Sequence, residues 1–303
     1  MPQKPKSRLL RKEARAAYIY LIPAFIGLIV LTYVPLVAVF GLSFFKWGGT
    51  GVPEWVGLGN YIKLFTSDPY FTESVKVTIY FSLLAVIGSM IYSLVIALLL
   101  NRNIPARGFF RAVFYLPYVL PATAVYIGWS WLYNTEWGLF NYILSKLGIE
   151  RLMFVSSSSQ VVPSLALIAV WLSGNLIVIF LAGLQNVPRV YHEAAQIDGA
   201  NSWQRFWNVT IPSMTPIIFY NMLMALITNM QVVTPALALT KGGPGKSSYF
   251  ISYMLYNYAF KQRGKLGLAC AIAFVLFLLI GAFTLILFAT SKSWIFYEGG
   301  ENK

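Results

Sequence analysis

Six long apolar segments dominate the pattern of hydrophobic and polar positions along the chain. An α-helix needs about 20 apolar residues to cross a bilayer, and each segment is at least that long. The pattern therefore predicts an all-α membrane protein with six transmembrane helices. The segments cover residues 18–45, 77–100, 110–133, 161–184, 215–239 and 266–290.

Between the apolar segments, the polar stretches indicate how the chain is divided and oriented. Residues 1–17 are strongly basic, and basic flanks usually stay in the cytoplasm. We therefore expect a cytoplasmic N-terminus over residues 1–17, a first transmembrane helix over 18–45 and a core transmembrane bundle over 70–290. Six crossings then predict a cytoplasmic tail over 291–303. The basic loop 240–265 does not fit this rule, because six crossings place it outside.

Charge is nearly absent from the interiors of all six segments. Intramembrane Asp, Glu, Lys, Arg and His are the usual carriers of ion or proton coupling, so a proton-driven transporter is disfavoured. A Na⁺ site built from backbone carbonyls would escape this argument. If the chain moves a solute, we expect the energy to come from outside its own membrane helices.

Composition agrees with a membrane protein and excludes several kinds of site. The chain is 58% hydrophobic and 11% charged, whereas soluble domains have roughly 25% charged residues. Its net charge of +13 needs no nucleic acid to explain it, because cytoplasmic loops of membrane proteins collect Lys and Arg. The lone Cys270 and the lone His192 make a metal centre improbable, and we see no catalytic group of nucleophile and base.

The stretch "TKGGPGKSS" at 240–248 resembles the end of a phosphate-binding loop of ATPases. Gly245, Lys246 and Ser247 match the end of the pattern, but Thr240 stands where the first glycine belongs. The stretch follows a membrane helix instead of a buried strand and lies on the predicted outside. We interpret its Gly-Gly-Pro as the turn that ends the fifth span.

The polar segment between the fourth and fifth spans predicts a helical elbow. Pro188 suits the first turn of a helix over 189–197, and Asp198-Gly199 suits a helix stop. Asn201 or Ser202 can cap a second short helix that reaches residue 209.

Two sets of side chains suggest how this elbow is used. Ala194, Ala195 and Ala200 leave a slim face that another protein can approach. Three aromatic residues are expected to tuck the second helix against its own bundle, and Pro212 is expected to separate it from the fifth span. The aromatic residues are Trp203, Phe206 and Trp207.

The spacing of residues in this elbow resembles a known signature. "EAA" at 193–195, Gly199, and "VTIP" at 209–212 match the EAA motif of permease subunits of binding-protein-dependent ABC importers. Val209 and Ile211 are mild departures from it. Four further stretches look like the carbohydrate-uptake branch, the maltose and glycerol-phosphate permease type. They are "WVGLGNYIKLF" (55–65), "TKGGP" (240–244), "GKLGLACAIAFVLFL" (264–278) and "WIFYEG" (294–299).

The resemblance implies a type I importer-like fold and a role for the loop 185–215 in coupling to an ATPase. Glu193 would be the polar contact, Ala194 and Ala195 would fit a cleft of the ATPase, and Gly199 would permit the turn. The implied coupling residues are Glu193, Ala194, Ala195, Asp198, Gly199, Ala200, Ile211 and Pro212.

The resemblance also implies partners and a location. It implies a second homologous permease subunit, two ABC ATPase subunits that bind ATP and Mg²⁺, and an extracellular solute-binding protein that delivers a sugar. This chain itself would bind no cofactor. It would be a multi-pass protein of a bacterial plasma membrane, with both termini in the cytoplasm.

A sugar needs hydrogen-bonding groups and an aromatic surface, so polar and aromatic residues inside spans are candidates for its pathway. Asn221 and Asn229 are eight residues apart and share a helix face. Contacts between helices explain such residues equally well. In similar permeases the helix before "GGP" holds the sugar, which favours Asn229, and Pro117 and Pro121 are expected to kink the third span. The candidates are Asn229, Asn221, Gln231, Trp171 and Asn175.

Other functions remain open at this point. The chain is interpreted as a non-enzymatic permease subunit for a sugar, and the alternatives are a permease for another solute, an ion-coupled secondary transporter, a membrane enzyme or an assembly protein. The sequence does not name the solute. Cys270 is expected to be a small packing residue and His192 a neighbour of the docking site.

Overall fold

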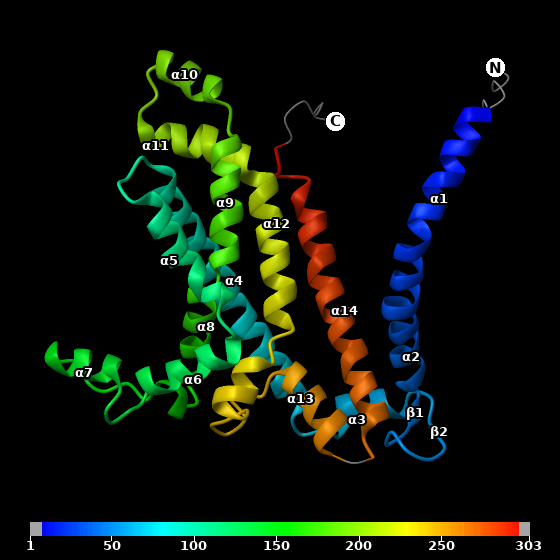
Figure 1. The fold of residues 1–303 in the computed structure, drawn as a ribbon. Helices are drawn as coiled ribbons and strands as arrows, with labels where there is room; N and C mark the ends of the chain where they lie inside the picture. Colours follow the sequence, from blue (N-terminus) through cyan, green and yellow to red (C-terminus); the bar gives the residue numbers. More distant parts are fainter. Residues whose placement is uncertain (1–7, 263, 297–303) are drawn as a thin grey trace.

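The computed structural model describes residues 8–262 and 264–296 as a helical bundle with one small hairpin (Figure 1). The helices are α1 (Arg8–Leu28), α2 (Val34–Leu42), α3 (Gly59–Thr66), α4 (Phe71–Asn101), α5 (Arg107–Val119), α6 (Ala122–Leu132), α7 (Leu139–Lys146), α8 (Val161–Trp171), α9 (Gly174–Asn186), α10 (Arg189–Ile197), α11 (Ser202–Arg205), α12 (Ile211–Met230), α13 (Ile251–Tyr256) and α14 (Leu266–Ser291). Short helical turns are η1 (Ile29–Tyr33), η2 (Phe154–Ser156), η3 (Phe206–Thr210), η4 (Ala236–Thr240) and η5 (Asn257–Lys261), and the strands are β1 (Phe45–Lys46) and β2 (Glu54–Trp55).

Among the described residues, four continuous helices are long and apolar enough to cross a membrane, and two bent pairs bring the total to six. The all-α membrane bundle with six spans is therefore confirmed, with each bent pair counted as one span. The four continuous helices are Arg15–Leu42, Phe71–Asn101, Ser202–Met230 and Leu266–Ser291.

Two of the long helices accommodate a proline through a π-helical turn. The turn η1 precedes Pro35 and η3 precedes Pro212, and each proline lies at the start of the next α-helix. Proline has no N–H to donate, and a wider turn avoids the clash with the preceding carbonyl. The expectation that Pro212 separates the elbow from the fifth span is therefore wrong, because helical backbone continues from Ser202 to Met230.

The third and fourth spans are broken. The axes of α5 and α6 differ by 99°, and Pro121 is the N-cap residue that directly precedes α6. The axes of α8 and α9 differ by 48°, with Ser173 at the break. The kink expected in the third span is confirmed and is a full change of direction (Figure 1). At the second break, Gly174 lies so close to α5 that a Cβ atom would stand 2.9 Å from the carbonyl oxygen of Phe114.

The helix α4 lies at the centre of the bundle and packs against α8, α9 and α12. Its buried face consists largely of Ser, Ala and Thr, which let neighbouring helices approach closely in a membrane. Ser93 forms a hydrogen bond of 2.9 Å with Ser173 at the break between α8 and α9. The central helix therefore holds the broken fourth span directly.

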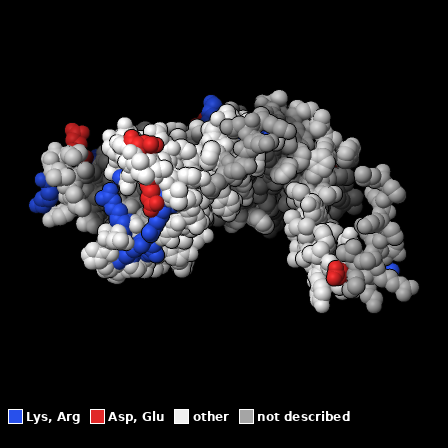
Figure 2. Space-filling model, turned by 90° about the horizontal axis from the view of Figure 1, so that it is seen from above, with Lys and Arg blue, Asp and Glu red and all other residues white. Residues whose placement is uncertain are grey.

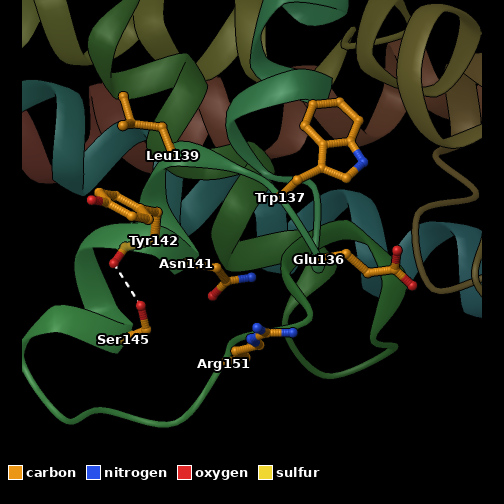
Figure 3. Close-up of a pocket in the computed structure, with 7 residues that line it drawn as sticks. All are labelled: Glu136, Trp137, Leu139, Asn141, Tyr142, Ser145 and Arg151. Carbon is orange, nitrogen blue, oxygen red and sulfur yellow. Dashed lines mark hydrogen bonds between the residues drawn. The ribbon is translucent and has the colours of Figure 1, made fainter.

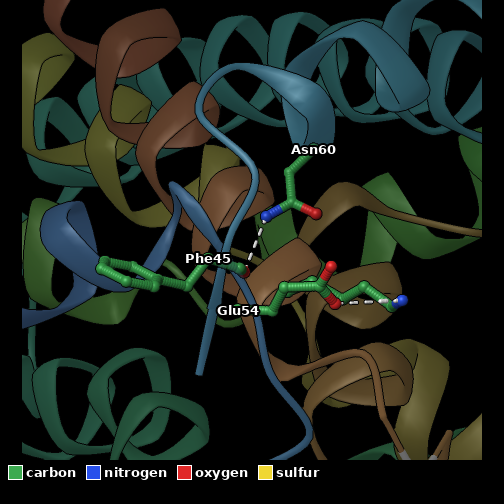
Figure 4. A network of polar contacts seen from close by, with 4 residues as sticks. Phe45, Glu54 and Asn60 are labelled. Carbon is green, nitrogen blue, oxygen red and sulfur yellow. Dashed lines mark hydrogen bonds and ion pairs between the residues drawn. The ribbon is translucent and has the colours of Figure 1, made fainter. Parts of the chain in front are cut away.

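The first span stands apart from the bundle and is attached near one end (Figure 1). Phe40 packs on Phe274 of α14 with ring centroids 4.6 Å apart. Asn60 Nδ2 donates to the carbonyl oxygen of Phe45 at 2.9 Å (Figure 4). It also donates to the carbonyl oxygen of Ser43 at 2.8 Å. Lys46 and Glu54 pair across the β1–β2 hairpin at 3.4 Å, and both are exposed.

The fifth span ends earlier than its apolar pattern predicts. The helix α12 stops at Met230, and Gln231 is its C-cap. The Gly-Gly-Pro of residues 242–244 follows η4 in a separate loop, so its interpretation as the turn that ends the span is wrong. Branched Val232 and Val233 and the proline at 235 disfavour a continuous helix through residues 231–235, which periodicity alone does not reveal.

The two ends of the bundle carry different elements (Figure 1). The helices α10 and α11 lie at the same end as the start of α1 and the end of α14. The β1–β2 hairpin, α3, α7 and α13 lie at the other end. The basic loop 240–265 is at this second end, as six crossings predict.

Gly267 provides a test of how the hairpin is attached. A Cβ on Gly267 would overlap the carbonyl oxygen of Phe45, whereas a Cβ on Gly281 of the same helix meets no atom within 4 Å. We expect Gly267→Ala to lower stability by roughly 1–3 kcal/mol through overpacking. Gly281→Ala should be neutral or stabilising by about 0.5–1 kcal/mol, because alanine favours helix.

Thermal unfolding of the two purified variants in one detergent would measure this difference. Equal melting temperatures for Gly267→Ala and Gly281→Ala would show that the hairpin does not contact α14 as described.

Candidate functional site

The expected helical elbow forms one candidate site, and its turn is fixed by backbone hydrogen bonds. Gly199 has φ +79° and follows the C-cap Asp198. Its N–H donates to Gln196 O at 3.0 Å, and the Ala200 N–H donates to Ala195 O at 2.8 Å. This pair of hydrogen bonds is the Schellman motif, which requires a residue that tolerates positive φ. The expected role of Gly199 as the turn residue is therefore confirmed.

The second helix of the elbow begins with a reciprocal cap. The Asn201 side chain accepts from the Gln204 N–H at 2.9 Å, and the Gln204 side chain accepts from the Asn201 N–H at 2.8 Å. This capping box confirms Asn201 as the cap. Together with the Schellman turn it gives the elbow a defined shape without any partner.

The outer face of α10 is open to a partner. Glu193 and Ala194 are exposed, and Ala195 is half-buried. On the same helix, Val190 and Ile197 are 68% and 87% exposed. Their spacing of seven residues places these two apolar side chains on one face. Sequence reasoning missed them, although the spacing Val190, Ala194, Ile197 was a detectable signal.

The remaining predicted coupling residues lie elsewhere on the elbow. Asp198 is exposed and Ala200 half-buried, both in the turn beside Glu193. Ile211 and Pro212 are half-buried at the start of α12, at the base of the elbow. The structure therefore brings the residues from 193 to 200 together and keeps the last two apart from them.

The aromatic residues of α11 and η3 do not tuck inward as predicted. Trp203 is 69% exposed and Trp207 is 49% exposed, while Phe206 is half-buried. The three rings pack on one another, with the two indole centroids 5.6 Å apart. Trp203 lies in α11, and Phe206 and Trp207 lie in the π-helical turn η3; the helical spacing did not reveal that the two indoles stay exposed.

A cavity of about 400 Å³ lies where the two broken spans meet α4 and α12. Backbone groups freed by a helix break are tolerated in a membrane only where protein or water satisfies them, so breaks commonly line cavities. Among the described residues, no charged side chain lines this one. Its walls are formed by Phe81, Ser89, Tyr118, Leu120, Ala122, Tyr126, Ala169, Leu172, Ser173, Asn175, Leu176, Met224, Ala225, Thr228, Asn229 and Val232.

Two of the predicted pathway residues line this cavity, and three do not. Asn175 and Asn229 face it from α9 and α12. Asn221 is fully buried, with Nδ2 donating to Leu176 O at 3.4 Å. Gln231 is exposed at the end of α12, and Trp171 packs edge-on against Trp129 at 5.6 Å.

Sequence reasoning missed Ser89, Tyr118 and Tyr126 as lining residues. The two tyrosines lie on either side of Pro121, and the 99° change of direction brings both to the cavity. Their positions flanking a proline in mid-span were the available signal. Ser89 had none, because serine is common on packed faces of membrane helices.

Another pocket of about 410 Å³ lies at the opposite end of the molecule, around α7 (Figure 3). Its buried member, Asn141, donates to Thr135 O and Leu152 O at 3.1 and 2.8 Å, so it holds the loop together. Glu136, Trp137, Tyr142 and Arg151 are exposed. This pocket is a surface feature of the α6–α7 region and is separate from the cavity at the helix breaks.

Comparison with known proteins provides evidence on the family of the chain that is independent of its structure. Residues 89–292 match the family described as "Binding-protein-dependent transport system inner membrane component". The chain is 37% identical to the probable ABC transporter permease protein YesP of Bacillus subtilis, over 98% of this chain and 96% of that one. It is 31% identical to the trehalose/maltose transport system permease protein MalF of Thermococcus litoralis, over 92% and 95%. With the multiple sugar-binding transport system permease protein MsmF of Streptococcus mutans the identity is 34%, over 91% and 94%.

Solved structures agree on the fold. A chain in the crystal structure of a bacterial ABC transporter involved in the import of the acidic polysaccharide alginate superposes with a TM-score of 0.79 at 21% identity. The match covers 94% of this chain and 99% of that chain. The type I importer-like bundle expected from the sequence is therefore confirmed.

The cavity makes a prediction that needs no substrate. Thr228 lines it, whereas Asn221, seven residues earlier on α12, is buried against other helices. A charged, membrane-impermeant thiol reagent should modify Thr228→Cys at least about tenfold faster than Asn221→Cys, because only water-accessible thiols ionise and react readily. The native Cys270 is buried and supplies little background.

The measurement is the labelling rate in detergent and in membranes, with the unmodified chain as control. Equal rates at positions 228 and 221 would show that water does not reach the cavity.

Proposed function

The chain belongs to the family of binding-protein-dependent transport system inner membrane components, and we propose that it carries a sugar as a permease subunit of an ATP-driven ABC importer. The observation that supports this most directly is the uncharged polar cavity at the two helix breaks. Relatives named for trehalose, maltose and multiple sugars support the substrate class.

The chemistry of the cavity suits a neutral, hydroxyl-rich solute. Ser89, Ser173 and Thr228 supply hydroxyl groups, and Asn175 and Asn229 supply amides that both donate and accept. Tyr118 and Tyr126 supply ring faces against which a sugar can pack, and their hydroxyls add further partners. A volume of about 400 Å³ falls within the range of small-molecule sites.

The elbow suits a contact with a partner that hydrolyses ATP. Glu193 offers a charged hydrogen-bonding group, Ala194 and Ala195 allow close approach, and Val190 and Ile197 offer exposed apolar area. In this proposal two ABC ATPase subunits bind ATP and Mg²⁺, and the chain binds neither.

A single run of helix links the elbow to the cavity. Backbone of helical type runs from Ser202 through η3 and α12 to Met230, and Thr228 and Asn229 near its end line the cavity. A movement imposed on the elbow is thereby carried to the solute site as a shift of this helix. The π-helical turn η3 is the point where the direction of this run changes (Figure 1).

The remaining partners follow from the importer assignment. A second homologous permease subunit would complete the pathway, and an extracellular solute-binding protein would deliver the sugar to the end that carries α7. The elbow end, with the basic start of α1, would face the cytoplasm of a bacterial cell, so both termini would lie inside.

The proposed contact between the elbow and the ATPase is tested with variants that should uncouple ATP hydrolysis from sugar transport. Glu193→Ala and Gly199→Asp should assemble with the partner subunits but transport roughly tenfold less sugar per ATP hydrolysed. The first loses a charged hydrogen bond, typically about 1.5–3 kcal/mol, and the second strains a left-handed turn by about 1–2 kcal/mol. The measurement is sugar uptake and ATP hydrolysis by the complex in proteoliposomes.

Matched controls are available at the end of the molecule opposite the elbow. Glu150 is an exposed carboxylate, and Gly148 has φ +71° with no atom within 4 Å of a Cβ. Glu150→Ala and Gly148→Asp should leave the amount of sugar transported per ATP hydrolysed unchanged. Normal coupling in both elbow variants would refute the elbow contact.

The solute site is tested by truncating the amides. Asn175→Ala and Asn229→Ala should each raise the sugar concentration for half-maximal uptake roughly threefold to tenfold, because each removes a hydrogen bond worth about 0.5–1.5 kcal/mol. Gln231→Ala, the matched amide outside the cavity, should leave uptake unchanged. An equal effect of all three substitutions would indicate that the cavity is not the solute site.

A further inference from the structure

A third cavity, of about 770 Å³, lies beneath the elbow, and we refer to it as the elbow cleft. It is formed between the elbow and the end of the central helix α4. Its lining residues are Val95, Leu98, Arg102, His192, Ser202, Trp203, Arg205, Phe206 and Thr210. This cleft is distinct from the outer face of α10 on which the proposed ATPase contact rests.

The polar wall of the elbow cleft is basic. Arg102 follows the last residue of α4, and Arg205 comes from α11. Neither acidic residue of the elbow, Glu193 or Asp198, lines the cleft. Seen from this end, basic side chains gather in a band on the lobe of the molecule that carries the elbow (Figure 2).

The guanidinium of Arg205 is incompletely satisfied. One of its terminal nitrogens donates to Ser202 Oγ at 3.2 Å. Its Nε is buried and has no hydrogen-bond partner among the described residues. A buried donor without a partner is unfavourable by about 1–3 kcal/mol, so an acceptor that reaches Nε would be stabilised. An arginine fork matches the oxygens of a phosphate or carboxylate.

The opposite wall of the elbow cleft is apolar and belongs to a membrane span. Val95, Leu98 and Arg102 are spaced three and four residues apart, so they follow one another along one face of α4. Val95 is 48% exposed and lies within the hydrophobic span. A ligand held by Arg102 therefore continues into a lipid-facing groove, which a soluble anion would leave empty.

Aromatic residues indicate that the elbow cleft lies at the membrane–water interface. Trp203 lines it and Trp207 packs against Trp203, and both indoles are exposed. Tryptophan is enriched at membrane–water interfaces, where its ring sits among lipid headgroups. Basic pockets at this level bind anionic headgroups.

We propose that the elbow cleft binds an anionic phospholipid, with its phosphate at Arg102 and Arg205 and an acyl chain along Leu98 and Val95. The lipid bridges α4 and the elbow, so anionic lipid stabilises the elbow in the position described. This inference does not depend on the transported solute.

The test is native mass spectrometry of the full-length chain in neutral detergent, titrated with phosphatidylglycerol or phosphatidylcholine. We expect tighter retention of phosphatidylglycerol by the unaltered chain. The double variant Arg102→Gln/Arg205→Gln should bind it roughly 25-fold more weakly, about fivefold for each arginine. Arg102→Lys/Arg205→Lys keeps both charges and should retain most of the affinity.

The matched control removes two exposed basic residues at the other end of the molecule. Lys146→Gln/Arg151→Gln should change phosphatidylglycerol binding less than twofold, because neither residue lines the cleft. An equal loss in this control, or unchanged binding in the double cleft variant, would overturn the proposal. Melting temperatures in phosphatidylcholine establish that each variant is folded.

Two further arms distinguish other occupants. Millimolar inorganic phosphate should not displace the lipid, and displacement would assign the site to a free anion. If the double variant keeps its lipid but fails to bind the ATPase subunit, the cleft belongs to that protein and the lipid proposal is wrong.

A second measurement tests the proposal if the double variant does not fold. Phosphatidylglycerol with brominated chains should quench tryptophan fluorescence more in the unaltered chain than in Trp203→Phe, relative to brominated phosphatidylcholine. Identical quenching differences in the two proteins would also overturn the proposal.

Discussion

Backbone hydrogen bonding inside a membrane is the constraint on which the rest of this structure depends. Lipid chains offer no hydrogen bonds, so every N–H and C=O must find a partner in the protein or in water that fills a cavity. Within the part of the chain that the structure describes, continuous helices meet this requirement in four spans. The other two spans are broken, and both breaks lie at a cavity lined by hydroxyl, amide and phenol groups. The departures from helix thus coincide with the place where a polar solute can be accommodated.

Packing around the central helix keeps the broken spans in place. The serine, alanine and threonine residues on the buried face of α4 allow α8, α9 and α12 to approach closely. The hydrogen bond between Ser93 and Ser173 joins α4 to the break itself. On the other side of the same break, Gly174 allows the backbone of α5 to pass nearby. Contacts from α4 and α5 thus hold the break at the cavity from two neighbouring helices.

The elbow combines a fixed backbone shape with a surface of exposed apolar and aromatic side chains. Its Schellman turn provides hydrogen bonds for backbone groups at the C-terminal end of α10. Its capping box does the same at the N-terminal end of α11. Its apolar residues Val190 and Ile197 remain exposed, and so do the indoles of Trp203 and Trp207. Such a surface is suited to partners on two sides: a protein against the outer face of α10 and lipid at the cleft below. The helical run into α12 then connects both contacts with the cavity.

Much of this could be predicted from local sequence. Long apolar runs determined the number of spans, because helix is the structure that satisfies backbone in lipid. Gly199 and Asn201 determined the turn and cap of the elbow, because positive φ and N-capping are properties of single residues and their neighbours. Asn175 and Asn229 were identified as candidates, though the same reasoning also selected Asn221, Trp171 and Gln231.

Only the tertiary structure decided which of these side chains meet. The 99° change of direction at Pro121 brings Tyr118 and Tyr126 to the cavity, and no periodic pattern encodes the size of such an angle. Trp203 in α11 and Trp207 in the π-helical turn at residues 206–210 are exposed, although the sequence predicted that they pack inward. Helix type and span number follow from interactions within one segment, whereas cavities, clefts and exposed faces depend on the relative directions of several segments.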